Sequence, residues 1–157
     1  MNMMFSEEGN YILQCIVLNL PTEHIAFMLP LIETKLLELC KDRRGCRVIQ
    51  RVLEKFPRHE LAPIIDKIIK AANELTPQQY GNYVIVHILQ KGLESEKVKI
   101  LDSIMDNIVQ FSMYQLGSNV VENCLKTAPT EYLDAILERI SAVPVATPEG
   151  SRDVSLV

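Results

Sequence analysis

Apolar residues return along this chain at a fixed interval of 36 residues. One column of such positions holds Ile12, Val48, Val84 and Val120, and no insertion or deletion interrupts its register. A period of this length predicts tandem units that stack into one continuous core. The remaining apolar columns are Leu13, Ile49, Ile85 and Val121; Val17, Leu53, Leu89 and Leu125; Met28, Ile64, Ile100 and Ile136; Leu29, Ile65, Leu101 and Leu137; and Ile32, Ile68, Ile104 and Ile140.

Within each unit the apolar positions follow the turn of a helix. In the second unit Val48, Ile49, Val52 and Leu53 form one stripe at positions i, i+1, i+4 and i+5. The polar residues that begin at Cys46 lie away from this stripe. One side of the helix is therefore expected to pack, and the other side is expected to be free for recognition.

Helix breakers divide each unit into segments. They stand at near-equivalent places, namely Pro21, Pro57, Gly92 and Pro129. Each precedes a second periodic segment, such as His59 to Ala72 or Glu94 to Ile108. A third, shorter helix is predicted around Thr34 to Lys41, Thr76 to Tyr80 and Val109 to Tyr114. Few strand-like runs compete with these helices, so the chain is predicted to be almost wholly α-helical.

The period divides the chain into four units and a tail. The units span about 1–32, 33–68, 69–104 and 105–142. The tail, 143–157, contains Pro144, Pro148 and Gly150, which break helices. It is predicted to be a linker or the start of a further unit.

Composition narrows the range of functions. The 157 residues carry a net charge of -4, so overall basicity gives no argument for nucleic-acid binding, and such an argument must rest on local residues. The four cysteines show neither a CxxC spacing nor a metal-ligand pattern with the three histidines, and free thiols are expected. No catalytic constellation or P-loop is present in the sequence, which predicts neither an enzyme nor a bound cofactor or metal.

The N-terminal sequence bears on the cellular compartment. The segment before Glu7 and Glu8 is too short to form the apolar region of a signal peptide. No run of about 18 apolar residues occurs in the chain. Neither secretion nor membrane spanning is therefore predicted. A cytoplasmic location is expected, with the nucleus or nucleolus as alternatives.

A glycine opens the first helix of each unit, at Gly9, Gly45, Gly81 and Gly117, and is expected to allow a sharp turn between helices. The polar positions that follow vary from unit to unit: Asn10-Tyr11-x-x-Gln14, Cys46-Arg47-x-x-Gln50, Asn82-Tyr83-x-x-Val86 and Ser118-Asn119-x-x-Glu122. Four such segments in register closely resemble the Pumilio (PUF) family of RNA-binding proteins, whose helical repeats each bind one base. The resemblance covers about residues 6 to 142 and is to the fourth to seventh of eight repeats. It implies an all-α, right-handed α-solenoid of four armadillo-like repeats.

The spacing of these polar residues has its own physical reason. Residues at i and i+4 lie one above the other on a helix and can meet the edge of one flat base. The residue at i+1 projects to the side, where it can stack between neighbouring bases. The predicted base-edge residues are Asn10, Gln14, Cys46, Gln50, Asn82, Val86, Ser118 and Glu122, and the predicted stacking residues are Tyr11, Arg47, Tyr83 and Asn119.

Each pair of base-edge residues favours one base. Glu122 beside Ser118 suits guanine, because a carboxylate accepts from the paired donors N1–H and N2–H. The other two matched pairs are Gln14 with Asn10, which fits uracil, and Gln50 with the small Cys46, which fits adenine. In the remaining unit, Val86 stands where the family's uracil-reading repeat carries glutamine. The side chain of valine cannot form a hydrogen bond, so Asn82 alone would hold that base edge. The unit is therefore expected to accept more than one base.

The resemblance also implies an RNA orientation and a biological role. PUF proteins run antiparallel to their RNA, which gives 5′-GUAU-3′ across this chain, the centre of a UGUA-type element in the 3′ untranslated region of messenger RNA. The implied role is post-transcriptional repression, with co-repressor or deadenylase proteins on the convex face. Arg43, Arg44 and Arg51 could follow the phosphates, or form only a solvated surface. The alternative function is an armadillo-like protein-interaction scaffold that has weak or no RNA affinity.

Both ends of the chain are expected to expose apolar packing surface, because terminal repeats without a polar cap tend to associate. The residues concerned are Met1, Met3, Met4 and Phe5 at one end and Val143, Val145, Val154, Leu156 and Val157 at the other. Self-association through these ends is predicted at high concentration.

Overall fold

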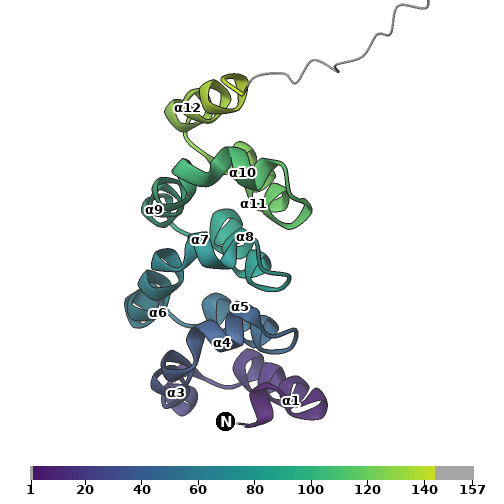
Figure 1. Ribbon diagram of the computed structural model, residues 1–157. Helices are drawn as coiled ribbons and strands as arrows, with labels where there is room; N and C mark the ends of the chain where they lie inside the picture. The colour runs from purple at the N-terminus through teal and green to yellow at the C-terminus, as the bar shows by residue number, and fades with distance from the viewer. Residues whose placement is uncertain (1, 144–157) are drawn as a thin grey trace, which may run out of the picture.

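The computed structural model describes residues 2–143, which form a curved stack of helices (Figure 1). Three rows run along the stack. The inner row holds α1 (Glu7–Asn19), α5 (Gly45–Lys55), α8 (Gly81–Lys91) and α11 (Gln115–Thr127). The middle row holds α4 (Leu36–Lys41), α7 (Ala72–Leu75) and α10 (Ile108–Ser112). The outer row holds α2 (Thr22–Ile25), α3 (Met28–Thr34), α6 (Arg58–Lys70), α9 (Glu94–Ile104) and α12 (Thr130–Ser141).

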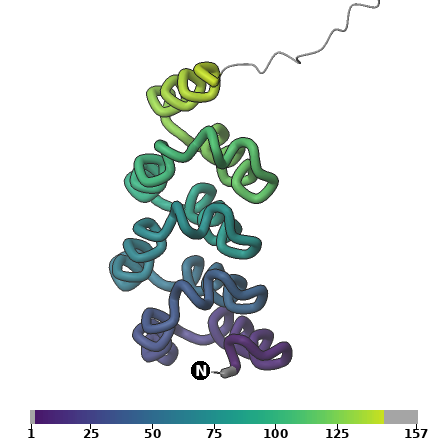
Figure 2. Tube along the Cα trace, viewed as in Figure 1, coloured from purple at the N-terminus to yellow at the C-terminus, as the bar shows by residue number. Residues whose placement is uncertain are grey.

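Two short 3₁₀ helices complete the described chain: η1 (Asn2–Met4) precedes α1, and η2 (Met105–Asn107) joins α9 to α10. Successive inner helices pack directly against one another, α1 on α5, α5 on α8 and α8 on α11. The same order is visible along the Cα trace (Figure 2). The predicted all-helical repeat stack is therefore confirmed. None of the helices in residues 2–143 is both long and apolar enough to cross a membrane.

The core follows the 36-residue columns. Val48, Val84 and Val120, which occupy the same place on α5, α8 and α11, are fully buried between neighbouring inner helices. The columns that continue onto the outer row, such as Ile65 with Leu101, are buried as well. Each unit alone would leave this apolar stripe in water, so stacking on the next unit provides the burial that stabilises it.

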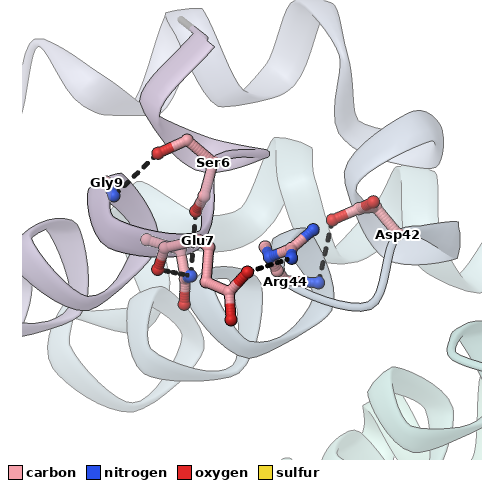
Figure 3. Close-up of polar contacts among 6 residues, drawn as sticks. Ser6, Glu7, Gly9, Asp42 and Arg44 are labelled. Carbon is pink, nitrogen blue, oxygen red and sulfur yellow. Dashed lines mark hydrogen bonds and ion pairs between the residues drawn. The ribbon is translucent and has the colours of Figure 1, made fainter.

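Side-chain oxygens accept hydrogen bonds from backbone N–H groups at the start of the first two inner helices (Figure 3). The Oγ of Ser6 accepts a hydrogen bond from the backbone N–H of Gly9 at 2.7 Å. One unit later, Oδ1 of Asp42 accepts from the backbone N–H groups of Arg44 at 2.8 Å and Gly45 at 2.7 Å. A bond of this kind contributes about 1 kcal/mol, and both hold the glycine that precedes the recognition segment.

The repeated glycines allow a close approach between backbones. A Cβ atom on Gly45 would lie 2.6 Å from the carbonyl oxygen of Leu39, at the end of the preceding middle helix. On Gly9, Gly81 and Gly117 it would meet the equivalent carbonyl oxygens of Met3, Leu75 and Phe111 at 2.7, 2.9 and 2.7 Å. The glycine therefore lets each inner helix start against the helix before it.

Replacing Gly45 with alanine is expected to lower the free energy of unfolding by about 1 kcal/mol, because the cost of a clash with fixed backbone exceeds the gain in helix propensity. Gly81→Ala, where the approach is 2.9 Å, is expected to cost less. Urea unfolding of the two variants measures both effects. Equal or increased stability of Gly45→Ala would contradict this explanation of the glycine.

Two predicted elements are wrong in detail. The short helix expected at Thr76 to Tyr80 lies earlier, as α7, and residues 76–80 form turns. The outer segment of the first unit is split into α2 and α3. Pro30 lies in the first turn of α3 and lacks the N–H that would bond to the carbonyl of Ala26, whereas Pro63 stands inside α6 without breaking it. In the structure the carbonyl of Ala26 accepts from the N–H of Leu29 instead.

The first inner helix exposes a surface that its counterparts bury. Ile12 is 53% exposed, whereas Val48, Val84 and Val120 in the same column are fully buried. At the other end of the stack, Leu137 is 54% exposed and its counterpart Leu101 is fully buried. Among the predicted end residues, Met4 is buried and Val143 is exposed, while Met1, Val145, Val154, Leu156 and Val157 lie outside the described residues.

These end surfaces lead us to expect reversible self-association of this chain at high concentration, because each end presents half of an apolar interface between units. Sedimentation velocity over a concentration series measures it. Ile12→Lys, which places a charge in the exposed surface of α1, is expected to weaken the association. A strict monomer at hundreds of micromolar would contradict the expectation.

Candidate nucleic-acid interface

The predicted recognition residues lie on the inner row, and their exposure depends on their place in the motif. Among the stacking residues, Tyr11 is 69% exposed, Tyr83 is 51% exposed and Arg47 is exposed too. At position i+4, Gln14, Gln50 and Val86 are half-buried, and Glu122 is exposed. At position i, Asn10, Cys46 and Asn82 are buried, and Ser118 is half-buried. The surface offered to a ligand therefore comes mainly from positions i+1 and i+4.

A groove of about 450 Å³ runs between α5 and α8. The pair Cys46 and Gln50 contributes to it from α5, together with Arg47, and Tyr83 contributes from α8. It therefore combines one base-edge pair with the stacking side chains of two successive units. Its full lining is Gln14, Arg43, Cys46, Arg47, Gln50, Arg51, Tyr80, Tyr83, Val86, His87 and Gln90.

The charge of this groove is favourable for an anionic ligand. Its lining contains three arginines and no carboxylate. Arg43 and Arg47 form no ion pair with the residues in the described part of the chain, whereas Arg51 bonds to Glu54 at 2.5 Å. The local surface is therefore basic although the whole chain is acidic. This distinction could not be made from net charge alone.

A second, smaller groove of about 170 Å³ lies between α1 and α5. It repeats the same arrangement one unit earlier, with Asn10 and Gln14 as the base-edge pair and Tyr11 and Arg47 as the stacking residues. Glu7 and Arg44 also contribute to its lining, and their side chains form an ion pair at 3.1 Å (Figure 3). Arg44 is therefore partly neutralised.

The residues at position i are bonded to their own helix. Nδ2 of Asn10 donates to the carbonyls of Ser6 at 2.9 Å and Glu7 at 2.7 Å, and Oδ1 of Asn10 accepts from Nε2 of Gln14 at 2.8 Å. The hydroxyl of Ser118 donates to the carbonyl of Gln115 at 3.0 Å. These bonds fix the first turn of each inner helix. Asn10 also orients the amide of Gln14, which keeps its oxygen and one N–H free.

Asn82 is bonded on both sides of its amide. Its Nδ2 donates to the carbonyls of Gln78 at 2.7 Å and Gln79 at 3.1 Å, and its Oδ1 accepts from Nδ2 of Asn119 at 2.8 Å. The side chain belongs to a residue that is only 1% exposed. Contact between Asn82 and a base stays a prediction: both N–H groups of its amide are in use, and its oxygen, which could accept a second bond, is buried.

Glu54 and His87, close to the larger groove, have shifted pKa values. Burial opposes ionisation of Glu54, but hydrogen bonds from Lys91 and Arg51 outweigh it and lower the pKa of this carboxyl group. Burial lowers the pKa of His87, and nearby Glu54 only partly opposes the shift. His87 is therefore neutral at pH 7 and contributes a polar edge to the larger groove, not a positive charge.

Some groove residues were not anticipated from the motifs. Tyr80, one residue before Gly81, lines the larger groove, and Gln90 lies at its far end. The place of Tyr80 in the repeat is taken by Glu8, Arg44 and Leu116 in the other units. This variability beside a fixed glycine is the signal in the sequence that could have identified it.

Comparison with known proteins agrees with this architecture. The family model of the Pumilio-family RNA binding repeat matches residues 35–69, 73–105 and 107–141. The Puf3 RNA binding domain, solved bound to a 3′ UTR recognition sequence, is 30% identical with a TM-score of 0.82, and the match covers 88% of this chain and 41% of that one. By sequence, no curated protein matches the chain significantly.

Two further structures show the same fold. PUF-8 in complex with PBE-RNA is 28% identical with a TM-score of 0.80, over 87% of this chain and 40% of that one. PUF-6 in complex with 5BE13 RNA is 23% identical with a TM-score of 0.85, over 93% and 45%. The chain thus spans less than half the length of these solved proteins. Because repeats of this one kind match most of its residues, the chain belongs to the Pumilio (PUF) family.

Proposed function

We propose that this chain binds single-stranded RNA in a sequence-specific manner on its inner row of helices, one base per unit. The observation that carries the proposal is the groove between α5 and α8. It holds a base-edge pair, Cys46 and Gln50, between the side chains of Arg47 and Tyr83, and no carboxylate lines it. A flat, uncharged base attached to an anionic backbone fits such a site.

The proposed RNA is 5′-GUAU-3′, read antiparallel to the chain. Glu122 and Ser118 bind the guanine edge, and Glu122 is exposed on α11 and available for it. The larger groove takes the adenine, and the smaller groove, with Gln14, takes the final uracil. Arg43, which lines both grooves, is the best-placed residue to contact a phosphate.

The biological role that we propose is post-transcriptional repression through a UGUA-type element in 3′ untranslated regions, in the cytoplasm. The Puf3 domain, a 30% identical relative, was solved with a 3′ UTR recognition sequence, which supports this class of target. Co-repressor or deadenylase proteins would bind the outer row of helices.

The test is a fluorescence anisotropy titration with a short RNA that contains UGUAUA and a matched RNA in which the guanine is changed to cytosine. Tighter binding to the first RNA is expected, because cytosine lacks the paired donors that Glu122 accepts from. Equal, weak binding to both RNAs would favour a protein-interaction scaffold instead.

Val86→Gln is expected to tighten binding to RNA with uracil at the second base of GUAU by about 0.5 to 1.5 kcal/mol, the value of one neutral hydrogen bond. The new amide would take the place that Gln14 has on α1, next to the exposed Tyr83. Anisotropy titrations with each base at this position measure the change, and the preferences at the other bases are expected to stay the same. Unaltered affinity would mean that Val86 does not face a base.

A further inference from the structure

Asn82 and Asn10 occupy the same place in their units. Their Nδ2 atoms form equivalent hydrogen bonds, but their Oδ1 atoms have different partners. In both, Nδ2 donates to the two backbone carbonyls four and three residues earlier. These acceptors fix the orientation of each amide, so Oδ1 must point the other way. In Asn10 this oxygen accepts from Gln14 of the same helix. In Asn82 it accepts from Asn119 of the next helix, 37 residues away in sequence.

Asn119 therefore supplies the donor that is lost when valine stands at position 86. The other units carry Tyr11, Arg47 or Tyr83 at the corresponding place, and these side chains project into solvent. Asn119 instead is half-buried and lies against Asn82. A short amide stacks poorly on a base, but it can satisfy a buried carbonyl oxygen, which is costly to leave unpaired.

A second side-chain bond joins the same two helices one turn further along α11, at Asn123. Nδ2 of Asn123 donates to the backbone carbonyl of Asn119 at 2.8 Å. Oδ1 of Asn123 accepts from Nε2 of Gln90 on α8, also at 2.8 Å. The four amides thus join α8 to α11 at two points, and only the Asn119–Asn82 bond involves a predicted base-edge residue.

From this geometry we propose that Asn119 is a positioning residue that makes the second base of GUAU unselected. Asn119 bonds to Oδ1 of Asn82 and covers it, and because Asn82 is only 1% exposed, the second lone pair of this oxygen is not accessible to a base. Val86 offers neither a donor nor an acceptor, so the unit has none at the base edge. The base there is held by stacking on Tyr83, which every base can do. This inference rests on the proposed RNA-binding function and specifies how one of its units reads RNA.

The test compares wild type, Asn119→Ala and Asn123→Ala on four RNAs that differ only in the base after guanine. Each variant removes one amide link between α8 and α11, so Asn123→Ala is the matched control for lost packing. Wild type and Asn123→Ala are expected to bind the four RNAs within about twofold. Asn119→Ala frees Oδ1 of Asn82 and is expected to prefer uracil and guanine, whose ring nitrogens carry a hydrogen, by about 2- to 10-fold.

Strong selection at this base by the wild-type protein would overturn the proposal. So would an Asn119→Ala variant that binds the four RNAs equally well, or one that prefers cytosine or adenine. If instead no protein selects any base, including the guanine before it, the proposed function itself has failed. The NMR side-chain amide signals of Asn119 in the wild-type protein provide a check that needs no variant. Their exchange with solvent is expected to be equally slow with all four RNAs, because the bond to Asn82 stays closed, and faster exchange with one base would also overturn the proposal.

Discussion

Glu122→Gln is expected to remove the preference for guanine at the first base and to weaken binding to GUAU RNA by about 1 to 3 kcal/mol, the value of a good paired contact to a base. The carboxylate can accept from both guanine donors, whereas an amide turns an N–H toward one of them. Preference is expected to move toward uracil. Binding titrations with all four bases at this position measure the change.

Two controls separate recognition from general effects of charge. In the free protein Glu122 forms an ion pair with Lys126 at 2.5 Å, and both side chains are largely exposed. Such a pair contributes little, so Lys126→Gln is expected to keep the guanine preference. Glu131→Gln, an exposed change on the outer helix α12, makes the same change in charge away from the grooves. Unchanged guanine preference in Glu122→Gln would remove this residue from the site.

Tyr83→Ala is expected to weaken binding to every RNA by about 1 to 3 kcal/mol without changing the order of base preference, because stacking does not depend on the base edge. Tyr83 lines the groove opposite Arg47 and is half exposed, so its loss affects the adenine site and its neighbour but leaves the core intact. Anisotropy titrations measure the loss, and thermal unfolding checks the fold.

Tyr83→Phe is the matched variant, since it keeps the aromatic ring and loses only the hydroxyl. Its affinity is expected to stay close to that of the wild-type protein. If Tyr83→Ala altered base preference while leaving total affinity unchanged, the side chain would contact a base edge and not its face.

Periodicity was the strongest guide to the fold. A column that stays apolar over two steps of 36 residues, such as Val48 to Val120, is expected to face a neighbour in each unit, and the burial of these residues confirms it. The position of α7 and the break between α2 and α3 were missed. The first depends on how the chain turns between rows. The second occurs in one unit only, so the period contains no sign of it.

The candidate site was predicted less completely. Residue type and helical phase sufficed to place Tyr11, Arg47 and Tyr83 on the exposed side of the inner row. They did not reveal that Asn82 is buried or that Asn119 is its partner, because a hydrogen bond between units depends on how two helices pack. A repeat pattern read one unit at a time contains no information about that contact.

Exchange of the base-edge residues of one unit tests most directly whether each unit binds one base. The double variant Cys46→Ser and Gln50→Glu gives α5 the same base-edge pair as Ser118 and Glu122 on α11, while Arg47 and Tyr83 remain. Affinities are measured for RNAs with each of the four bases at each position of GUAU. We predict that only the preference at the third base changes, from adenine to guanine. A third base that stays adenine, or a change at any other position, would contradict reading of one base by each unit.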